Sequence, residues 1–209
     1  GSASYLENTP PVALDTSITL SDADNTKLLK ATVSITSGLS AGDVLGFTSQ
    51  NGIIGSYDPD TGVLTLSGIA TIANYQTALR SVTYRSTSGF PTAQSATRTL
   101  TWVVDDGSAT SNTSAPVTSS LTITEANNAP VVVAGGTLTY PENDPATVID
   151  ANLTVTDSDS TELVGASVSI TSGLTSGDIL SFDNTATITS TFNSSTGVLT
   201  LTGRTSSVN

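Results

Sequence analysis

The chain has 209 residues, enough for one large or two ordinary domains that each bury a core. It contains no cysteine, methionine or histidine, which excludes thiol catalysis, disulfides, zinc sites with N or S ligands and any triad that uses imidazole. Eighteen acidic residues against six basic ones give a net charge of −12, so we expect no binding to the phosphates of nucleic acids. No apolar segment approaches the ~20 residues needed to cross a bilayer, so we expect no membrane insertion.

The first four residues, Gly-Ser-Ala-Ser, look like a cloning scar and spacer, and we expect them to lie outside the fold. After them, alternation of apolar and polar residues predicts a series of short strands. The predicted strands span residues 18–21, 31–36, 44–48, 53–57, 63–67, 82–86, 98–104 and 117–124. Turn-forming pairs such as Asn51-Gly52 and the segment DPDTG from Asp58 separate them, and we interpret DPDTG as a plain turn. Trp102 lies between Leu100 and Val104 in one strand, which predicts a core position.

One segment has helical spacing instead. Its apolar residues fall near one face of a helix, and Thr71 is placed as the N-cap. These residues are Ile72, Tyr75, Ala78, Leu79 and Val82. The pattern predicts an all-β fold, a Greek-key β-sandwich of the immunoglobulin-like type that contains one short helix.

The chain repeats itself at an offset of 135 residues. Residues 5–74 and 140–209 are identical at 31 of 70 positions without a gap. Segments that recur begin at Tyr5 and Tyr140, Ser21 and Thr156, Val33 and Val168, and Thr61 and Thr196. We therefore predict a first domain at 5–124, a linker and lead-in at 125–139, and a second, incomplete domain at 140–209. Because the second copy lacks counterparts of three strands, we expect it to be ordered only if a neighbouring copy or a continuation of the chain fills the gap.

Several short motifs follow one another in a characteristic order. Glu7-Asn8 is followed by DAD at Asp22, by YDPDTGVL from Tyr57, by WVVDDG from Trp102 and by the linker EANNAP from Glu125. The second copy repeats the first three of these. In this order and spacing the chain resembles the cadherin-like repeats of large bacterial surface adhesins, over nearly its whole length. The resemblance implies tandem cadherin-like sandwiches, each with one short helix.

That resemblance also implies Ca²⁺ between successive domains. The implied junction ligands are Glu7, Glu125, Asn127, Asn128, Asp157 and Asp159. Half a site at the outer end of the first domain would use Asp22, Asp24 and either Asp105 or Asp106. Spacing to the following glycine favours Asp105, whereas strand alternation favours Asp106.

The physical chemistry of the residues is compatible with this grouping. Calcium takes six to eight oxygens from carboxylates, amide carbonyls and water, and aspartates two apart at a strand end face the same side. No Lys or Arg lies within ten residues of Glu125, Asn127, Asn128, Asp157 or Asp159 to neutralise the acids. The alternatives are aspartates that bond nearby backbone amides in turns, a solvated linker, and an acidic surface that simply keeps the protein soluble.

The function we predict is that of a non-enzymatic structural module, part of a calcium-stiffened rod of repeats in an extracellular adhesin. Its partners would be neighbouring repeats of the same chain, with cell-surface glycans or proteins bound through other domains. Its location would be the bacterial surface or the secreted space, with roles in cell adhesion and biofilms. A carbohydrate-binding module is the main alternative and needs exposed aromatic side chains. A third alternative is a hydrolase that uses a pair of carboxylates.

Overall fold

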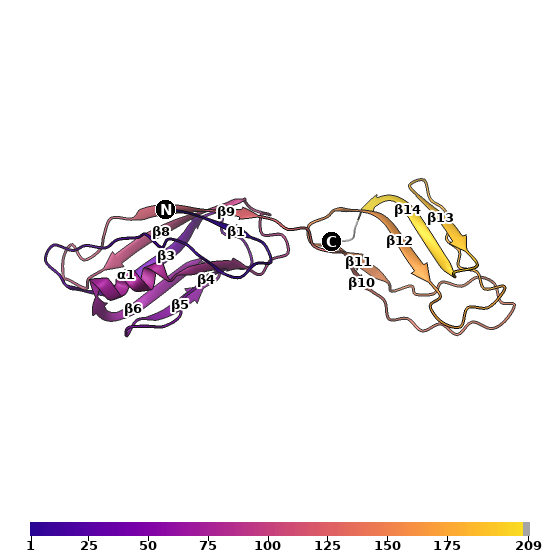
Figure 1. Ribbon diagram of the computed structural model, residues 1–209, viewed down its shortest axis with the longest axis horizontal. Coiled ribbons are helices and arrows are strands. Elements are labelled where there is room, and N and C mark those ends of the chain that lie inside the picture. The colour runs from indigo at the N-terminus through magenta and orange to yellow at the C-terminus, as the bar shows by residue number, and fades with distance from the viewer. Residues whose placement is uncertain (207–209) are drawn as a thin grey trace. The chain divides into compact units, whose positions relative to one another are not determined.

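The computed structural model describes residues 1–206. The chain divides into two compact units, Gly1–Ala126 and Asn127–Asn209, with the second described as far as residue 206 (Figure 1). Each unit is built from β-strands, and one short helix lies in the first. The predicted all-β class is confirmed.

The first unit is a sandwich of two sheets. The six-stranded sheet has the order β1-β9-β8-β3-β6-β5, and the three-stranded sheet has the order β2-β7-β4. The strands of the larger sheet are β1 (Ser2–Leu6), β9 (Val117–Thr124), β8 (Thr97–Asp105), β3 (Lys27–Ser37), β6 (Val63–Thr71) and β5 (Ile54–Asp58). Those of the smaller sheet are β2 (Val12–Ala13), β7 (Thr83–Ser86) and β4 (Asp43–Gly46). Every neighbouring pair is antiparallel except β1 and β9, which run parallel.

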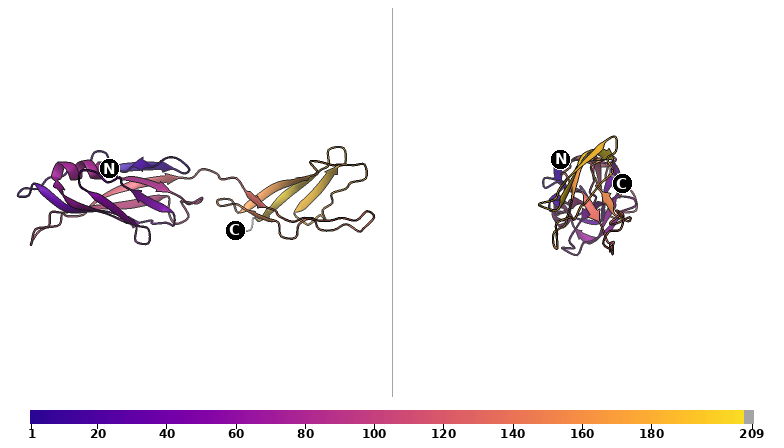
Figure 2. Two further views of the ribbon diagram at one scale, coloured as in Figure 1. Left: turned by 90° about the horizontal axis from the view of Figure 1, so that it is seen from below. Right: turned by 90° about the vertical axis from the view of Figure 1, so that its right-hand side faces the viewer.

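The helix α1 (Ile72–Arg80) follows β6 without a loop. Thr71 caps it as predicted, because its side-chain oxygen accepts a hydrogen bond from the Asn74 amide at 3.2 Å. Tyr75, Ala78 and Leu79 are its buried residues, which confirms the predicted apolar face. Within the first unit, α1 lies at the end opposite to the exit of β9 (Figures 1 and 2).

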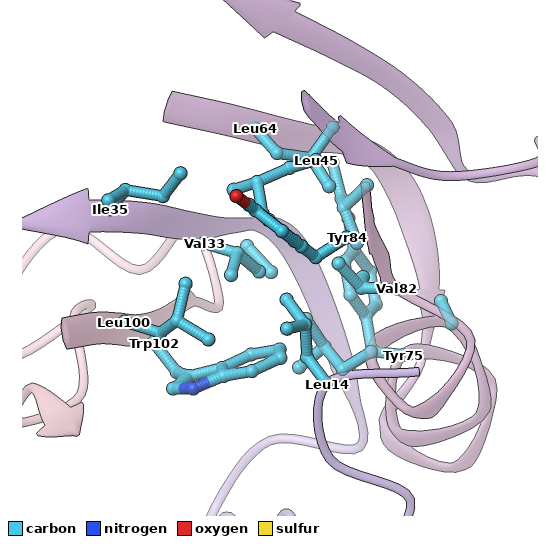
Figure 3. Close-up of a cluster of buried hydrophobic side chains, with 14 of the residues drawn as sticks. Leu14, Val33, Ile35, Leu45, Leu64, Tyr75, Val82, Tyr84, Leu100 and Trp102 are labelled. Carbon is cyan, nitrogen blue, oxygen red and sulfur yellow. The ribbon is translucent and has the colours of Figure 1, made fainter. Parts of the chain in front are cut away.

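The core lies between the two sheets (Figure 3). Alternate residues of β3, β6 and β8 point inward and meet residues of β4, β7 and α1. The main contributors are Val33, Ile35, Leu45, Leu64, Tyr75, Tyr84, Leu100 and Trp102. The Trp102 indole N–H donates to Ser119 Oγ at 2.8 Å, so this buried ring also has its polar atom satisfied. Trp102 is therefore the core residue that the sequence predicts.

Two expectations about local structure are wrong. Residues 18–21 form no strand, because their backbone bonds to side chains of the helix instead: the Leu20 amide donates to Gln76 Oε1, and the Ile18 carbonyl accepts from Arg80 Nε. Residues 2–4, expected outside the fold, belong to β1 and pair with β9 from Ser2 onward.

The second unit holds fewer strands. It contains a two-stranded sheet, β10 (Val131–Val133) with β11 (Thr154–Thr156). It also contains a three-stranded sheet in the order β12 (Glu162–Ser169), β14 (Val198–Ser206), β13 (Ile188–Asn193). By the 135-residue offset, β12, β13 and β14 correspond to β3, β5 and β6. A second helix, predicted as the counterpart of α1, would begin at residue 207, outside the described residues.

Candidate metal sites

Glu7 lies where β1 ends. Because β1 runs parallel to β9, its last residue Leu6 pairs with Thr124, and the Glu7 amide donates to the Thr124 carbonyl at 2.9 Å. The Glu7 side chain is buried, and its Oε2 accepts the Ala126 amide at 3.1 Å. The fold therefore places this carboxylate at the point where the chain leaves the first unit.

Glu125 also lies at that end, but its carboxylate has other partners. Its Oε1 accepts hydrogen bonds from both the amide (3.2 Å) and the hydroxyl of Thr92, in the loop before β8. The Glu125 carboxylate thus holds this loop at the C-terminal end of β9.

The two Asp-x-Asp (DxD) segments, Asp22–Asp24 and Asp157–Asp159, adopt the same turn. Asp22 Oδ1 accepts the amides of Asp24 (3.1 Å) and Asn25 (3.0 Å). Asp157 Oδ1 accepts the amides of Asp159 (3.2 Å) and Ser160 (3.0 Å). In each pair, Oδ1 of the first aspartate bonds the backbone amides of a turn, which is the alternative to a metal ligand that the sequence left open. These turn hydrogen bonds do not use Oδ2 of that aspartate or the carboxylate of the second aspartate.

In the second unit this turn meets the linker. Asp159 Oδ2 accepts the backbone amide (2.8 Å) and the side-chain amide (3.3 Å) of Asn128. The backbone hydrogen bond from Asn128 is the main cause that holds the pKa of Asp159 below its usual value. Asn127 donates its side-chain amide to the Asn128 carbonyl at 2.8 Å. Asn127, Asn128, Asp157 and Asp159 are thus brought together within one unit.

Two features of this group fit a bound cation. Asp157 is buried, and Asp159 Oδ1 is a buried oxygen without a hydrogen-bond partner. Among the ion pairs of residues 1–206, none involves Asp157 or Asp159. A buried carboxylate oxygen that has neither a donor nor a basic neighbour is unfavourable unless a cation meets it.

At the outer end of the first unit, Asp22 and Asp24 lie near Asp106. The side-chain hydrogen bond and the charge of Asp22 raise the pKa of Asp24 above its usual value, and the charge of Asp106 adds to this. The backbone amides of Asn25 and Asp24 lower the pKa of Asp22. Asp22 and Asp106 both line a pocket of about 140 Å³.

The structure distinguishes the two aspartates of the DDG turn. Asp106 Oδ2 accepts the side-chain amide of Asn25 at 2.7 Å, so it faces the DxD turn. Asp105 Oδ1 instead accepts the Gly107 amide at 2.8 Å and the Asn112 side chain at 3.4 Å. Of the two candidates, only Asp106 is placed with Asp22 and Asp24.

None of these groups is a complete metal centre made of acids. Within residues 1–206, no three acidic side chains gather closely enough to hold a metal ion. An ion at either place would need amide, backbone carbonyl or water oxygens to reach the six to eight ligands of calcium.

A buried polar cluster in the first unit was not predicted. Asp43 on β4 accepts Arg98 Nε on β8 at 2.7 Å and the Tyr84 hydroxyl on β7 at 2.5 Å. The sequence held one signal for it: Asp43 recurs as Asp178 inside the repeated segment SGL-x-x-GD. An acid at the same position in both copies favours a structural role.

Comparisons with known proteins give a loose likeness. No protein-family model matches the chain, and no curated protein matches it. One solved structure that aligns with it is that of protocadherin gamma B2 extracellular cadherin domains 1–5, at 16% sequence identity and a TM-score of 0.30; the alignment covers 97% of this chain and 30% of that one. Another is that of protocadherin gamma B7 extracellular cadherin domains 1–4, at 15% identity and a TM-score of 0.31, covering 98% of this chain and 39% of that one. The chain spans well under half the length of both. Such TM-scores are too low to establish a common fold, so the all-β assignment rests on the strands of this chain.

No helix within residues 1–206 has the length and apolar character needed to cross a membrane.

Proposed function

We propose that this chain is a non-enzymatic structural module of an extracellular adhesin, in which Ca²⁺ stiffens a rod of tandem repeats. The observation that carries the proposal is the buried, unpartnered Oδ1 of Asp159 beside the buried Asp157. Calcium is the cation that best suits such hard oxygen ligands without nitrogen or sulfur.

The proposed ligands fall into two sets. In the first, within the second unit, Asp157 and Asp159 bind the ion together with oxygens of Asn127 and Asn128. Glu7 and Glu125, at the end of the first unit, are the ligands that the cadherin-like resemblance would add to this set. Glu125 joins this set only after it releases Thr92, to which it is hydrogen bonded. In the second, Asp22, Asp24 and Asp106 form the protein's part of an outer site, whose remaining ligands would come from a preceding repeat.

The repeat supports the same proposal. The DxD turn has equivalent hydrogen bonds in both copies, although the copies are 135 residues apart and differ at many other positions. A rod of repeats needs the same junction at each step, which explains why this turn is retained. A bacterial surface location, a role in biofilms and adhesion through other domains of a longer protein complete the proposal.

The carbohydrate-binding alternative has less support. It needs a platform of exposed aromatic rings, and the exposed aromatic side chains within residues 1–206 are Phe90 and Tyr140. These two belong to different units, so neither unit presents a row of rings.

Calcium titration calorimetry of the full chain tests the proposal. We expect binding that Asp157→Asn with Asp159→Asn abolishes at the first set and leaves unchanged at the Asp22 end. The matched control is Asp183→Asn, because this aspartate is exposed and outside both sets. Absence of calcium binding, or equal loss in the control, would refute the proposed metal role.

Thermal unfolding gives a second readout. Only the folded chain gathers the ligands, so one site at 100-fold excess of calcium over its dissociation constant adds about 2.7 kcal/mol. We expect a higher melting temperature in millimolar calcium than in EDTA, and the shift should shrink in the double variant.

A further inference from the structure

The chain contains two Asp–Pro bonds, Asp58–Pro59 and Asp144–Pro145. An aspartate carboxylate can attack its own backbone carbonyl carbon, because the attack closes a five-membered ring. Proline favours the step that follows, since its nitrogen belongs to a tertiary amide and takes up a proton more readily than other peptide nitrogens. The fate of each bond in the folded chain therefore depends on the partners of the carbonyl and of the carboxylate.

Asp144–Pro145 follows a turn that both copies of the repeat share. The Asp144 amide donates to the Pro141 carbonyl at 3.3 Å, and the Thr9 amide donates to the Leu6 carbonyl at the same distance. These residues are equivalent at the 135-residue offset, and a proline comes next in both copies. The second copy thus has an aspartate where the first has Thr9.

A tyrosine hydroxyl contacts the carbonyl in this turn. Tyr140 donates to the Asp144 carbonyl, and its counterpart Tyr5 donates to the Thr9 carbonyl at 3.4 Å. The contact therefore belongs to the repeat and is present in the first unit as well. Thr9 is half-buried and Pro10 is exposed in that unit, so water reaches the bond there too. A donor at this oxygen stabilises the negative charge that forms when the carbonyl carbon is attacked.

The carboxylate of Asp144 is free to act as the nucleophile. Asp144 is exposed, and within residues 1–206 its carboxylate accepts no hydrogen bond and forms no ion pair. Tyr140 and Glu142 are the other titratable residues of the turn. Neither of them forms an ion pair with Asp144.

Asp58 differs in this respect. Its Oδ1 accepts the Asp60 amide at 3.0 Å. The Thr61 hydroxyl and the Asp60 amide lower the pKa of Asp58, which makes its carboxylate a weaker nucleophile. The Asp58 carbonyl does have a donor, the Gly62 amide at 2.9 Å, so the two bonds differ mainly in whether the carboxylate is already engaged.

We propose that Asp144–Pro145 is a self-cleavage site, at which mild acid divides the chain. A carboxylate oxygen of Asp144 attacks the backbone carbonyl carbon of the same residue, and Tyr140 donates to the oxygen that becomes negative. A proton from the solvent goes to the Pro145 nitrogen, the C–N bond breaks, and a cyclic anhydride is left at Asp144. Water opens the anhydride and restores both carboxyl groups, so the net reaction is hydrolysis of one peptide bond.

Mass spectrometry of the full chain tests the proposal, in a mildly acidic buffer with EDTA in which circular dichroism shows the fold to be intact. We expect fragments 1–144 and 145–209, with cleavage at Asp144–Pro145 at least about tenfold faster than at Asp58–Pro59. In urea the turn around Asp58 is lost, and the two bonds should be cleaved at similar rates. Equal rates in the folded chain, or no cleavage after Asp144, would overturn the proposal.

Variants of the turn separate self-cleavage from the action of a protease. Asp144→Glu keeps the charge but requires a larger ring, so cleavage should slow by about tenfold or more. Tyr140→Phe removes the donor and should slow cleavage by about tenfold. Glu142→Gln is the matched control, because it changes an acid of the same turn and should leave the rate as it is. Unchanged cleavage in Asp144→Glu would show that a protease is responsible.

Thr9→Asp transfers the site to the first unit, where Tyr5 supplies the same donor. We expect new cleavage between Thr9→Asp and Pro10, and we expect none in Thr9→Asn, which has no carboxylate. Failure of the folded Thr9→Asp variant to cleave there would overturn the claim that this turn promotes the reaction.

Discussion

Asp43 and Arg98 form an ion pair that joins the two sheets of the first unit, with both side chains fully buried and 2.7 Å between Oδ2 and Nε. Arg98 donates further hydrogen bonds to the carbonyls of Ser95 (2.5 Å) and Pro91 (2.7 Å). Tyr84 donates to the other oxygen of Asp43, and burial, together with this hydrogen bond, raises the pKa of Tyr84. The cluster therefore links β4 and β7 of one sheet to β8 of the other.

Removal of one partner should leave an uncompensated buried charge. For Arg98→Met we expect the free energy of unfolding of the first unit to fall by about 3–5 kcal/mol, measured by denaturant titration. The control is Arg204→Met, which breaks the exposed pair between Arg204 and Glu162 and should change stability by at most about 1 kcal/mol. Similar effects of the two variants would show that the buried pair has no special role.

The N-cap of α1 gives a second prediction, with a smaller expected effect on stability. Thr71→Ala removes the hydrogen bond to the Asn74 amide and should destabilise the first unit by about 1 kcal/mol. Thr77→Ala is the control, because Thr77 lies in the middle of α1, where alanine is the better helix former. A loss from Thr77→Ala as large as that from Thr71→Ala would mean that the cap is not what matters.

The sequence predicted what depends on local spacing or on the repeat. Thr71 and the apolar residues after it predicted the helix. The recurrence of the aspartate pair at Asp22 and Asp157 predicted an equivalent local structure in both copies, with a turn as the alternative to a metal ligand. The sequence did not predict the contact between Asp43 and Arg98, because these residues are 55 apart and on different sheets. Residues 18–21 alternate like a strand, but the side chains of Gln76 and Arg80 satisfy their backbone, and alternation alone cannot reveal such partners.

Asp150 provides a prediction about pH. The amides of Gly135, Gly136 and Asn152 donate to its carboxylate and hold its pKa below the ordinary value of 3.8. Because the folded state lowers this pKa, the stabilisation is present above pH 3.8 and is lost as the pH falls through the folded-state pKa. NMR titration of the carboxyl carbon should show a midpoint below 3.8.

The matched variant is Asp150→Asn. It should make the amide shifts of Gly135 and Gly136 insensitive to acid, while Asp144→Asn should leave their titration intact. A midpoint at or above 3.8 would contradict the observed hydrogen bonds.

Small-angle scattering with and without calcium tests the central claim most directly. If calcium holds successive repeats as a stiff rod, the maximum dimension of the full chain should rise when calcium replaces EDTA, and the rise should vanish in the variant Asp157→Asn with Asp159→Asn. Identical scattering curves in calcium and EDTA would contradict the account.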